Sequence, residues 1–247
     1  MPGVILIYDN TCTNTSNTTC TWTVPTGVCK VTFEAWGGGG GGGVMGTNCN
    51  CCQKGSPGSG GGSSKATIST IPGENYSIVA GAAGVSSQGW GAYCGICCNG
   101  CNGGTSYVTG TNLTNFCAGG GAGGLSDFNT TCYYYCACHW HSRTPGCGYG
   151  GDTVSRGTFG YQNFYGNTSP YGGVMWAGGA GGPGGGEGGV NMANGFCNGF
   201  ACAYAGASPM HGRVPGGGGA GSSCWNQCVC TPYASGRGAP GMVKITY

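Results

Sequence analysis

The sequence predicts an all-β protein in which much of the chain is irregular, extended backbone and helix is almost absent. Sixty of the 247 residues are glycine, and they are clustered, with an unbroken run at residues 37–43. Aromatic residues make up 11% of the chain and charged residues only 6%, which is the reverse of the balance typical of disordered chains. Segments towards both ends alternate apolar and polar residues as half-buried strands do, and no stretch shows a helical period.

The strands are predicted from this alternation. In residues 29–36, Val31, Phe33 and Ala35 alternate with polar residues, and residues 242–247 alternate in the same way. Because these two segments flank the glycine-rich part and have no other strong partner, we expect them to pair. Residues 65–71 and 76–80 are joined by a Pro-Gly-Glu-Asn turn and are predicted to form a hairpin. The predicted architecture is a small β-sandwich or sheet that the N- and C-terminal strands close.

The glycine clusters continue at residues 60–62, 119–124, 178–189 and 216–221. Extended backbone has no hydrogen bonds within its own segment, so its N–H and C=O groups must find partners on neighbouring chains. Glycine allows neighbouring chains to approach closely enough for these hydrogen bonds. Each glycine, however, costs about 0.5–1 kcal/mol more than alanine to order. We therefore expect additional cross-links between the loops that join the glycine clusters.

Cysteine is the candidate for those cross-links. The chain has 20 cysteines, an even number, and most lie between glycine clusters. Disulfides would stabilise the fold by about 2–4 kcal/mol each and suit an extracellular protein. The predicted disulfide cysteines are Cys49, Cys51, Cys52, Cys94, Cys97, Cys98, Cys101, Cys132, Cys136, Cys138, Cys147, Cys197, Cys202, Cys224, Cys228 and Cys230. The alternative is a structural zinc or iron ion, because Cys94, Cys97, Cys98 and Cys101 have a spacing compatible with tetrahedral thiolate ligation. No other cofactor is expected.

Four pieces of the chain occur in a recognisable order. They are WTVPTGV at residues 22–28 leading to FEAW at 33–36, IPGENYSIVAG at 71–81, the successive glycine clusters, and GAPGMVKITY at 238–247. Over about residues 20–247 this order resembles the glycine-rich tail-fibre and receptor-binding adhesin proteins of tailed bacteriophages. The resemblance implies a small β-structure formed by the first and last strands, and packed polyglycine-II helices whose connecting loops touch the host. The 20 cysteines depart from that family's pattern. We expect residues 1–20 to be an attachment segment and residues 21–247 to be the glycine-rich domain.

The loop at residues 132–147 combines aromatic, histidine and arginine side chains between cysteines. Aromatic side chains bury a large area at low entropic cost and are favoured in binding sites. The predicted receptor contacts are Tyr133, Tyr134, Tyr135, His139, Trp140, His141 and Arg143, and residues 161–165 and Trp225 are further candidates.

The expected function is therefore that of a viral, specifically phage, fibre or adhesin protein on the surface of the extracellular particle. The alternative is a purely structural virion component, such as a capsid decoration protein or a fibre subunit. The expected partners are a host surface receptor and other virion proteins. The protein is expected either to form a homo-oligomer, with a trimer favoured, or to dock on a trimeric fibre.

Other function classes lack support in the sequence. The acidic residues are isolated from one another, so no enzyme is expected. The net charge is +2 without a basic stripe, which argues against a nucleic-acid partner. No segment approaches the ~20 consecutive apolar residues of a membrane span, so no membrane insertion is expected.

Overall fold

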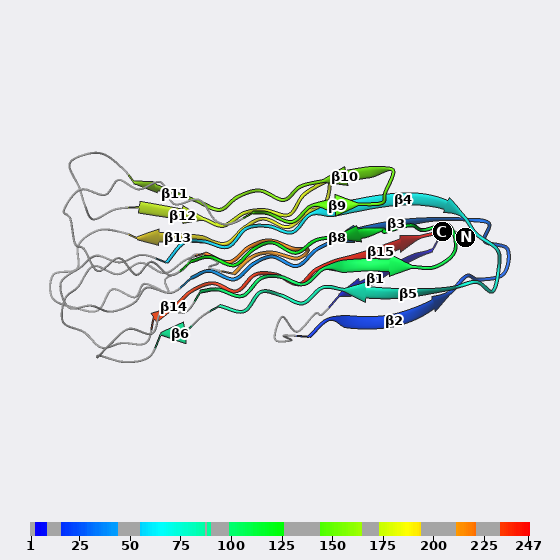
Figure 1. The fold of residues 1–247 in the computed structure, drawn as a ribbon, viewed down its shortest axis with the longest axis horizontal. Helices are drawn as coiled ribbons and strands as arrows, with labels where there is room; N and C mark the ends of the chain where they lie inside the picture. Colours follow the sequence, from blue (N-terminus) through cyan, green and yellow to red (C-terminus); the bar gives the residue numbers. More distant parts are fainter. Residues whose placement is uncertain are drawn as a thin grey trace.

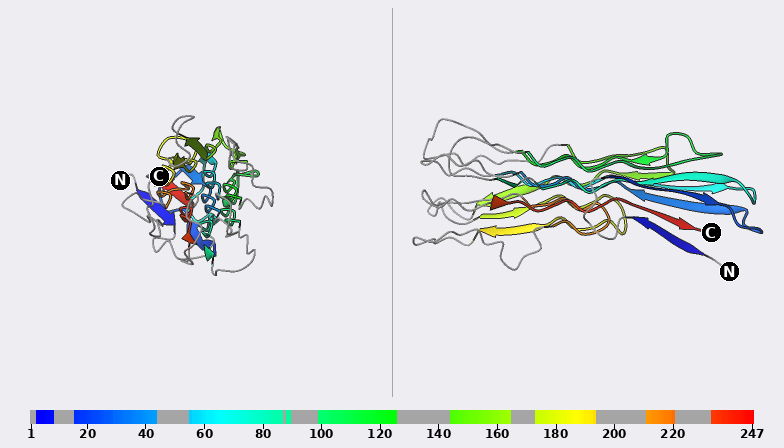
Figure 2. Two further views of the ribbon diagram at one scale, coloured as in Figure 1. Left: turned by 90° about the vertical axis from the view of Figure 1, so that its left-hand side faces the viewer. Right: turned by 90° about the horizontal axis from the view of Figure 1, so that it is seen from below.

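The computed structural model describes residues 3–8, 16–43, 55–86, 88–89, 99–125, 144–164, 173–193, 211–220 and 233–247. In these residues the protein is all-β and has no helix, as predicted. The molecule is elongated, and both termini lie at the same end (Figure 1). Two larger sheets occupy that end, and extended segments run from them along the long axis towards short strands at the other end (Figures 1 and 2).

The first sheet is antiparallel and has the strand order β1-β15-β3-β4-β10. Its strands are β1 (Val4–Tyr8), β15 (Met242–Thr246), β3 (Lys30–Trp36), β4 (Ser63–Ser69) and β10 (Thr153–Ser155). Strands β3 and β15 are neighbours, with Phe33 opposite Ile245. The predicted pairing of residues 29–36 with residues 242–247 is therefore confirmed.

The second sheet has the order β2-β5-β7-β8-β9 and is also antiparallel. Its strands are β2 (Thr18–Thr23), β5 (Asn75–Ala80), β7 (Ser106–Thr109), β8 (Cys117–Ala118) and β9 (Gly148–Tyr149). At the opposite end of the molecule, β11 (Tyr161–Phe164), β12 (Gly173–Trp176) and β13 (Val190–Ala193) form a small sheet, and β6 (Gln88–Gly89) pairs with β14 (Tyr233–Ala234).

The predicted hairpin of residues 65–71 and 76–80 is wrong, because β4 and β5 belong to different sheets. The turn itself is present: Glu74 N donates to Ile71 O, and Gly73 has a φ of 91° that favours glycine. Gly73 N also donates to Val24 O, which follows β2. The turn carries the chain from one sheet to the other, so the buried faces of both strands contribute to the same core.

The core draws apolar side chains from both sheets. Phe33 is fully buried, and its ring centroid lies 5.1 Å from that of Tyr76, 6.0 Å from Trp22 and 6.5 Å from Phe116. The Tyr76 hydroxyl donates to Thr111 O at 3.1 Å. Burial, together with the nearby Glu74 carboxylate, raises the pKa of Tyr76 to about 12, so this hydroxyl stays protonated at neutral pH. The other buried members of the core are Val24, Val31, Ala35, Ala66, Ile78, Val108, Ala118, Val243 and Ile245.

Residues 37–43 continue from β3 as the central helix of a polyglycine-II bundle. Their N–H groups bond three neighbouring segments in turn. Starting at residue 37, every third N–H donates to residues 55–62. The N–H one position later donates to residues 99–105, and the N–H two positions later donates to residues 235–241. A repeat of three residues is the signature of this extended helix, which has three residues per turn.

The carbonyl groups of the same run accept from three other segments. Gly38 O and Gly41 O accept from residues 119–125, Gly39 O from Gly84 N, and Gly40 O from Gly219 N, each at 2.8 Å. The run therefore has six neighbours, three bonded through its N–H groups and three through its C=O groups. The predicted polyglycine-II-like backbone is confirmed.

This central position explains why the run is unbroken. A Cβ atom at Gly39, Gly40 or Gly41 would collide with the backbone carbonyl of Gly217, Ala122 or Val85, respectively. The neighbouring segment at residues 55–62 is also hydrogen-bonded to six segments, and Ser56, Pro57 and Ser59 interrupt its glycines. Glycine is therefore required at the positions where a Cβ atom would meet a neighbouring backbone, and not throughout every surrounded segment.

Candidate binding surface

Several segments of the bundle are hydrogen-bonded to one another at the end away from the termini. There Gly43 N donates to Ser56 O, Ser56 N to Leu125 O, and Gly100 N to Gly124 O, at 2.8–2.9 Å. Gly236 N donates to Ala220 O at 2.7 Å. The residues that flank positions 44–54, 90–98, 126–143 and 221–232 therefore belong to one hydrogen-bonded bundle end.

The predicted receptor contacts lie outside the described residues. Tyr133, Tyr134, Tyr135, His139, Trp140, His141 and Arg143 all fall within positions 126–143. What the structure describes is the base from which this part of the chain departs, between Leu125 and Thr144.

Two buried serines of the neighbouring segment hold that base. Leu125 N donates to Ser56 Oγ at 2.6 Å. Ser59 Oγ lies 3.0 Å from Ala122 O and 3.3 Å from Thr144 O, so one hydroxyl contacts both sides of the base. Ser59 is fully buried and Ser56 nearly so. The sequence-based prediction did not identify these serines, because isolated serines within glycine clusters carry no distinctive pattern.

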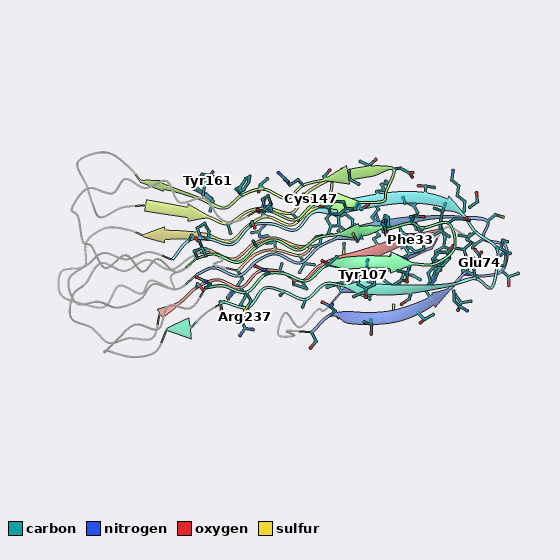
Figure 3. All side chains as sticks on the ribbon, in the orientation of Figure 1. Phe33, Glu74, Tyr107, Cys147, Tyr161 and Arg237 are labelled. Carbon is teal, nitrogen blue, oxygen red and sulfur yellow. The ribbon has the colours of Figure 1, made fainter. Side chains whose placement is uncertain are left out.

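An aromatic pair lies on the small sheet at the same end. The Tyr161 ring of β11 stacks on the Trp176 ring of β12, with the centroids 4.8 Å apart and the planes at 25°. Tyr161 is 48% exposed, and Phe159, two residues before it, is 46% exposed. Figure 3 shows Tyr161 on the flank of the bundle. Tyr161 was predicted from its aromatic-rich segment, whereas the partnership with Trp176 arises only from strand pairing.

Two of the predicted disulfide cysteines, Cys101 and Cys147, are described, and both are free. Cys147 Sγ accepts a hydrogen bond from Arg156 Nε at 3.1 Å, an interaction that raises the pKa of Arg156. The other described cysteines, Cys20, Cys29 and Cys117, are free as well. The remaining disulfide candidates lie outside the described residues: Cys49, Cys51, Cys52, Cys94, Cys97, Cys98, Cys132, Cys136, Cys138, Cys197, Cys202, Cys224, Cys228 and Cys230.

The alternative metal site also falls mostly outside the structure, since Cys101 is its one described member. Within the described ranges, no group of three or more His, Cys, Asp or Glu side chains is placed to hold a metal ion. In the same ranges, the chain forms no helix long and apolar enough to span a membrane.

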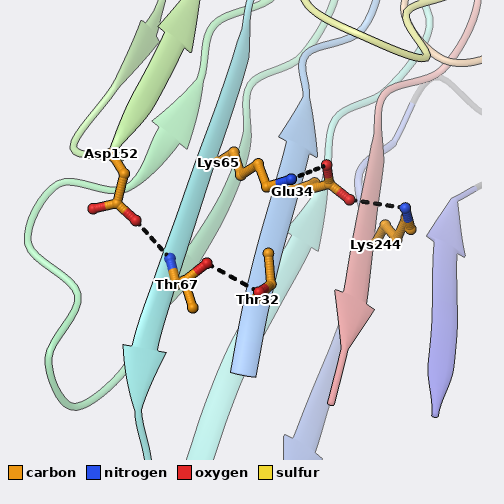
Figure 4. A network of polar contacts seen from close by, with 6 residues as sticks. All are labelled: Thr32, Glu34, Lys65, Thr67, Asp152 and Lys244. Carbon is orange, nitrogen blue, oxygen red and sulfur yellow. Dashed lines mark hydrogen bonds and ion pairs between the residues drawn. The ribbon is translucent and has the colours of Figure 1, made fainter. Parts of the chain in front are cut away.

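Glu34 lies in a charged network on the outer face of the first sheet (Figure 4). Its carboxylate is 3.2 Å from Lys65 Nζ on β4 and 2.9 Å from Lys244 Nζ on β15. Partial burial by itself would raise the pKa of Glu34, but the hydrogen bonds and positive charges of the two lysines outweigh it and lower the pKa. Cross-strand pairing brings the three residues together, with Lys65 and Lys244 both directly opposite Glu34.

We expect Glu34→Gln to lower the free energy of unfolding at pH 7 by about 0.5–1 kcal/mol, because both lysines are partly exposed and solvent screens the pairs. A carboxyl whose folded pKa is lowered stabilises the fold above its unfolded pKa of about 4.3, and that contribution is lost as the pH falls through the folded value. Urea unfolding at pH 7 and pH 3 should therefore show a difference between wild type and variant that shrinks in acid.

Glu187→Gln is the matched control for Glu34→Gln, since Glu187 pairs with Arg213 and both side chains are well exposed. This control should leave the free energy of unfolding unchanged at both pH values. An effect of Glu187→Gln as large as that of Glu34→Gln would contradict the assignment of the stabilisation to the cross-strand network.

A family described as a glycine-rich domain matches residues 13–247. The match thus covers both larger sheets except β1, and the whole polyglycine-II bundle. No curated protein matches the chain.

Proposed function

We propose that this chain, which belongs to the glycine-rich domain family, is a fibre or adhesin protein on the surface of a phage particle and binds a host receptor through the loops between its glycine segments. The observation that carries this proposal is the shared bundle end from which those parts of the chain depart. Hydrogen bonds between backbone groups hold the bundle, so the sequence of a connecting segment can change without altering the support. A rigid support also reduces the entropy lost when a receptor is bound.

The polarity of the molecule supports the same proposal. The two sheets and both termini lie at one end, and the segments flanking positions 126–143 are joined at the other (Figure 1). In this arrangement the sandwich end attaches to other virion proteins and the bundle end is presented to the host. Exposed aromatic side chains at the bundle end, including the stacked Tyr161, suit a surface that binds a partner.

The test is a triple variant of the predicted contact loop, with Tyr134, Trp140 and Arg143 replaced by alanine. Particles carrying it should assemble normally and fail to adsorb to host cells. The matched control replaces Tyr107, Tyr149 and Lys30, exposed side chains of the two large sheets, and should adsorb as wild type does.

Two outcomes would count against the proposal. Normal adsorption of the loop variant would mean that this loop is not the receptor contact. Failure of particles to assemble, with the purified variant still folded, would favour the alternative of a purely structural capsid decoration protein or fibre subunit.

A further inference from the structure

Strand β1 has an edge that no described strand of the chain pairs with, called the open edge below. It is the outermost strand of the first sheet, and in the described part of the chain it pairs with β15 alone (Figures 1 and 2). Its sequence, Val-Ile-Leu-Ile-Tyr, is apolar on both faces, whereas β3 and β15 place polar residues on their outer face. A strand with one solvated face normally alternates, and a continuous apolar strand is typical of burial on both faces.

The hydrogen bonds to β15 identify the backbone groups at this edge. Gly3 and Tyr247 exchange both of their hydrogen bonds, at 2.7 and 3.1 Å, so they form a hydrogen-bonded pair. Such hydrogen-bonded pairs occur at every second residue of an antiparallel ladder. The N–H and C=O groups of Ile5 and Ile7 therefore point towards β15. The N–H and C=O groups of the intervening residues, Val4, Leu6 and Tyr8, point to the open edge.

The same three residues expose their side chains. Val4 is 59% exposed, Leu6 52% and Tyr8 36%, and together they form an apolar row on the outer face of the sheet. Ile5 and Ile7 on the inner face pack against the core but are only partly buried. A strand added at this edge would therefore cover apolar surface on both faces.

The other edges of the two large sheets differ from β1. Strand β10 has three residues and β9 has two, and β2 is rich in threonine. Short or polar edge strands resist pairing with another chain, as do edges that carry lysine or proline. Strand β1 has none of these protections.

We propose that β1 pairs antiparallel with β1 of a second copy of this chain across a two-fold axis, with Leu6 opposite Leu6 and Val4 opposite Tyr8. In this register, the residues of one copy whose backbone groups point to the open edge lie opposite the same kind of residue in the other copy. The N–H and C=O groups of Val4, Leu6 and Tyr8 therefore all find hydrogen-bond partners. It also joins the two exposed apolar rows and brings Ile5 of one copy beside Ile7 of the other. No charged residue lies on the strand to oppose the approach.

The two-fold axis follows from the pairing itself, because identical antiparallel segments that pair with each other are related by a two-fold and not by a three-fold rotation. The inferred assembly therefore differs from the trimer that is favoured in the sequence-based expectation. It does not depend on the proposed receptor binding. A contact between two five-residue strands is small, so we expect a dissociation constant of roughly micromolar order.

Sedimentation equilibrium of the purified protein tests the proposal. Wild type should be a monomer–dimer mixture, and Leu6→Lys should raise the dimer dissociation constant at least about tenfold, because it removes an apolar contact and sets two like charges opposite each other. Ile71→Lys is the matched control, since Ile71 is 68% exposed in the turn between the sheets and should leave the dissociation constant unchanged. If near-UV circular dichroism shows that Leu6→Lys is misfolded, Leu6→Thr replaces it as the test variant.

A charge exchange tests the register. A Val4→Lys/Tyr8→Lys variant and a Val4→Glu/Tyr8→Glu variant should each be monomeric alone and should form a dimer when mixed, because position 4 of one copy faces position 8 of the other. The proposal is overturned if wild type stays monomeric at about 100 µM, well above the expected dissociation constant. It is also overturned by an oligomer that position 6 does not affect, or by charge variants that fail to associate on mixing.

Discussion

Gly40→Ala is expected to destabilise the protein by about 3 kcal/mol or more, because overpacking is costly where the obstructing atoms cannot move aside. The new Cβ would meet the carbonyl oxygen of Ala122, a backbone atom. Gly40 also donates to Ser59 O at 2.9 Å and accepts from Gly219 N at 2.8 Å, so a shift that relieves the collision weakens both hydrogen bonds. Urea unfolding followed by circular dichroism would measure the loss.

Gly179→Ala is the matched control, because Gly179 lies in the same bundle and has room for a side chain. The nearest atom to its Cβ would be Gly186 O at 3.4 Å, an ordinary contact, and its φ is not in the left-handed region. Since alanine lowers the entropy of the unfolded chain, this variant should be neutral or more stable by up to about 1 kcal/mol. Equal losses for Gly40→Ala and Gly179→Ala would contradict the central position of residues 37–43.

Phe33→Ala should cost about 3–5 kcal/mol, the range for removing a large buried aromatic side chain. Phe33 is fully buried, and its ring lies at the centre of contacts with Trp22, Tyr76 and Phe116, which come from the facing sheet and the segments around it. The substitution would leave a cavity between the two sheets and remove the ring contacts that join them. The same unfolding experiment measures the effect.

Phe159→Ala provides the comparison for this second variant. Phe159 is 46% exposed on the bundle, so its loss should change stability by no more than about 0.5 kcal/mol. A small effect of Phe33→Ala, comparable to that of Phe159→Ala, would show that the layers are not held together by this aromatic cluster.

The backbone hydrogen bonds of the bundle bear on the expected role of cysteine. Glycine is costly to order, and disulfides among sixteen loop cysteines are the predicted compensation. In the described residues, hydrogen bonds with a three-residue repeat link the segments, while Cys101 and Cys147 are free. Disulfides among the remaining candidates stay a prediction, which mass spectrometry with and without a reductant would check.

The sequence by itself determined the fold class and the buried faces of the strands. Val31 and Phe33 are buried as their alternation predicted, and the pairing of β3 with β15 followed from two alternating segments with no other strong partner. Glycine clusters without a helical period also predicted extended backbone, and the family resemblance implied its polyglycine-II form. These properties are local, since the period of a side-chain pattern and the size of a residue can be read within a few positions.

Only the tertiary structure decided which segments are neighbours. Alternation showed that β4 and β5 each bury one face, but both a hairpin and a crossing between sheets satisfy that pattern, and the crossing is what fills a common core. The six neighbours of residues 37–43 and the lysines beside Glu34 likewise depend on contacts between segments far apart in the chain. Backbone hydrogen bonds form without regard to side-chain identity, so the sequence of a glycine segment does not specify which segment it pairs with. The packing of all the segments together specifies it.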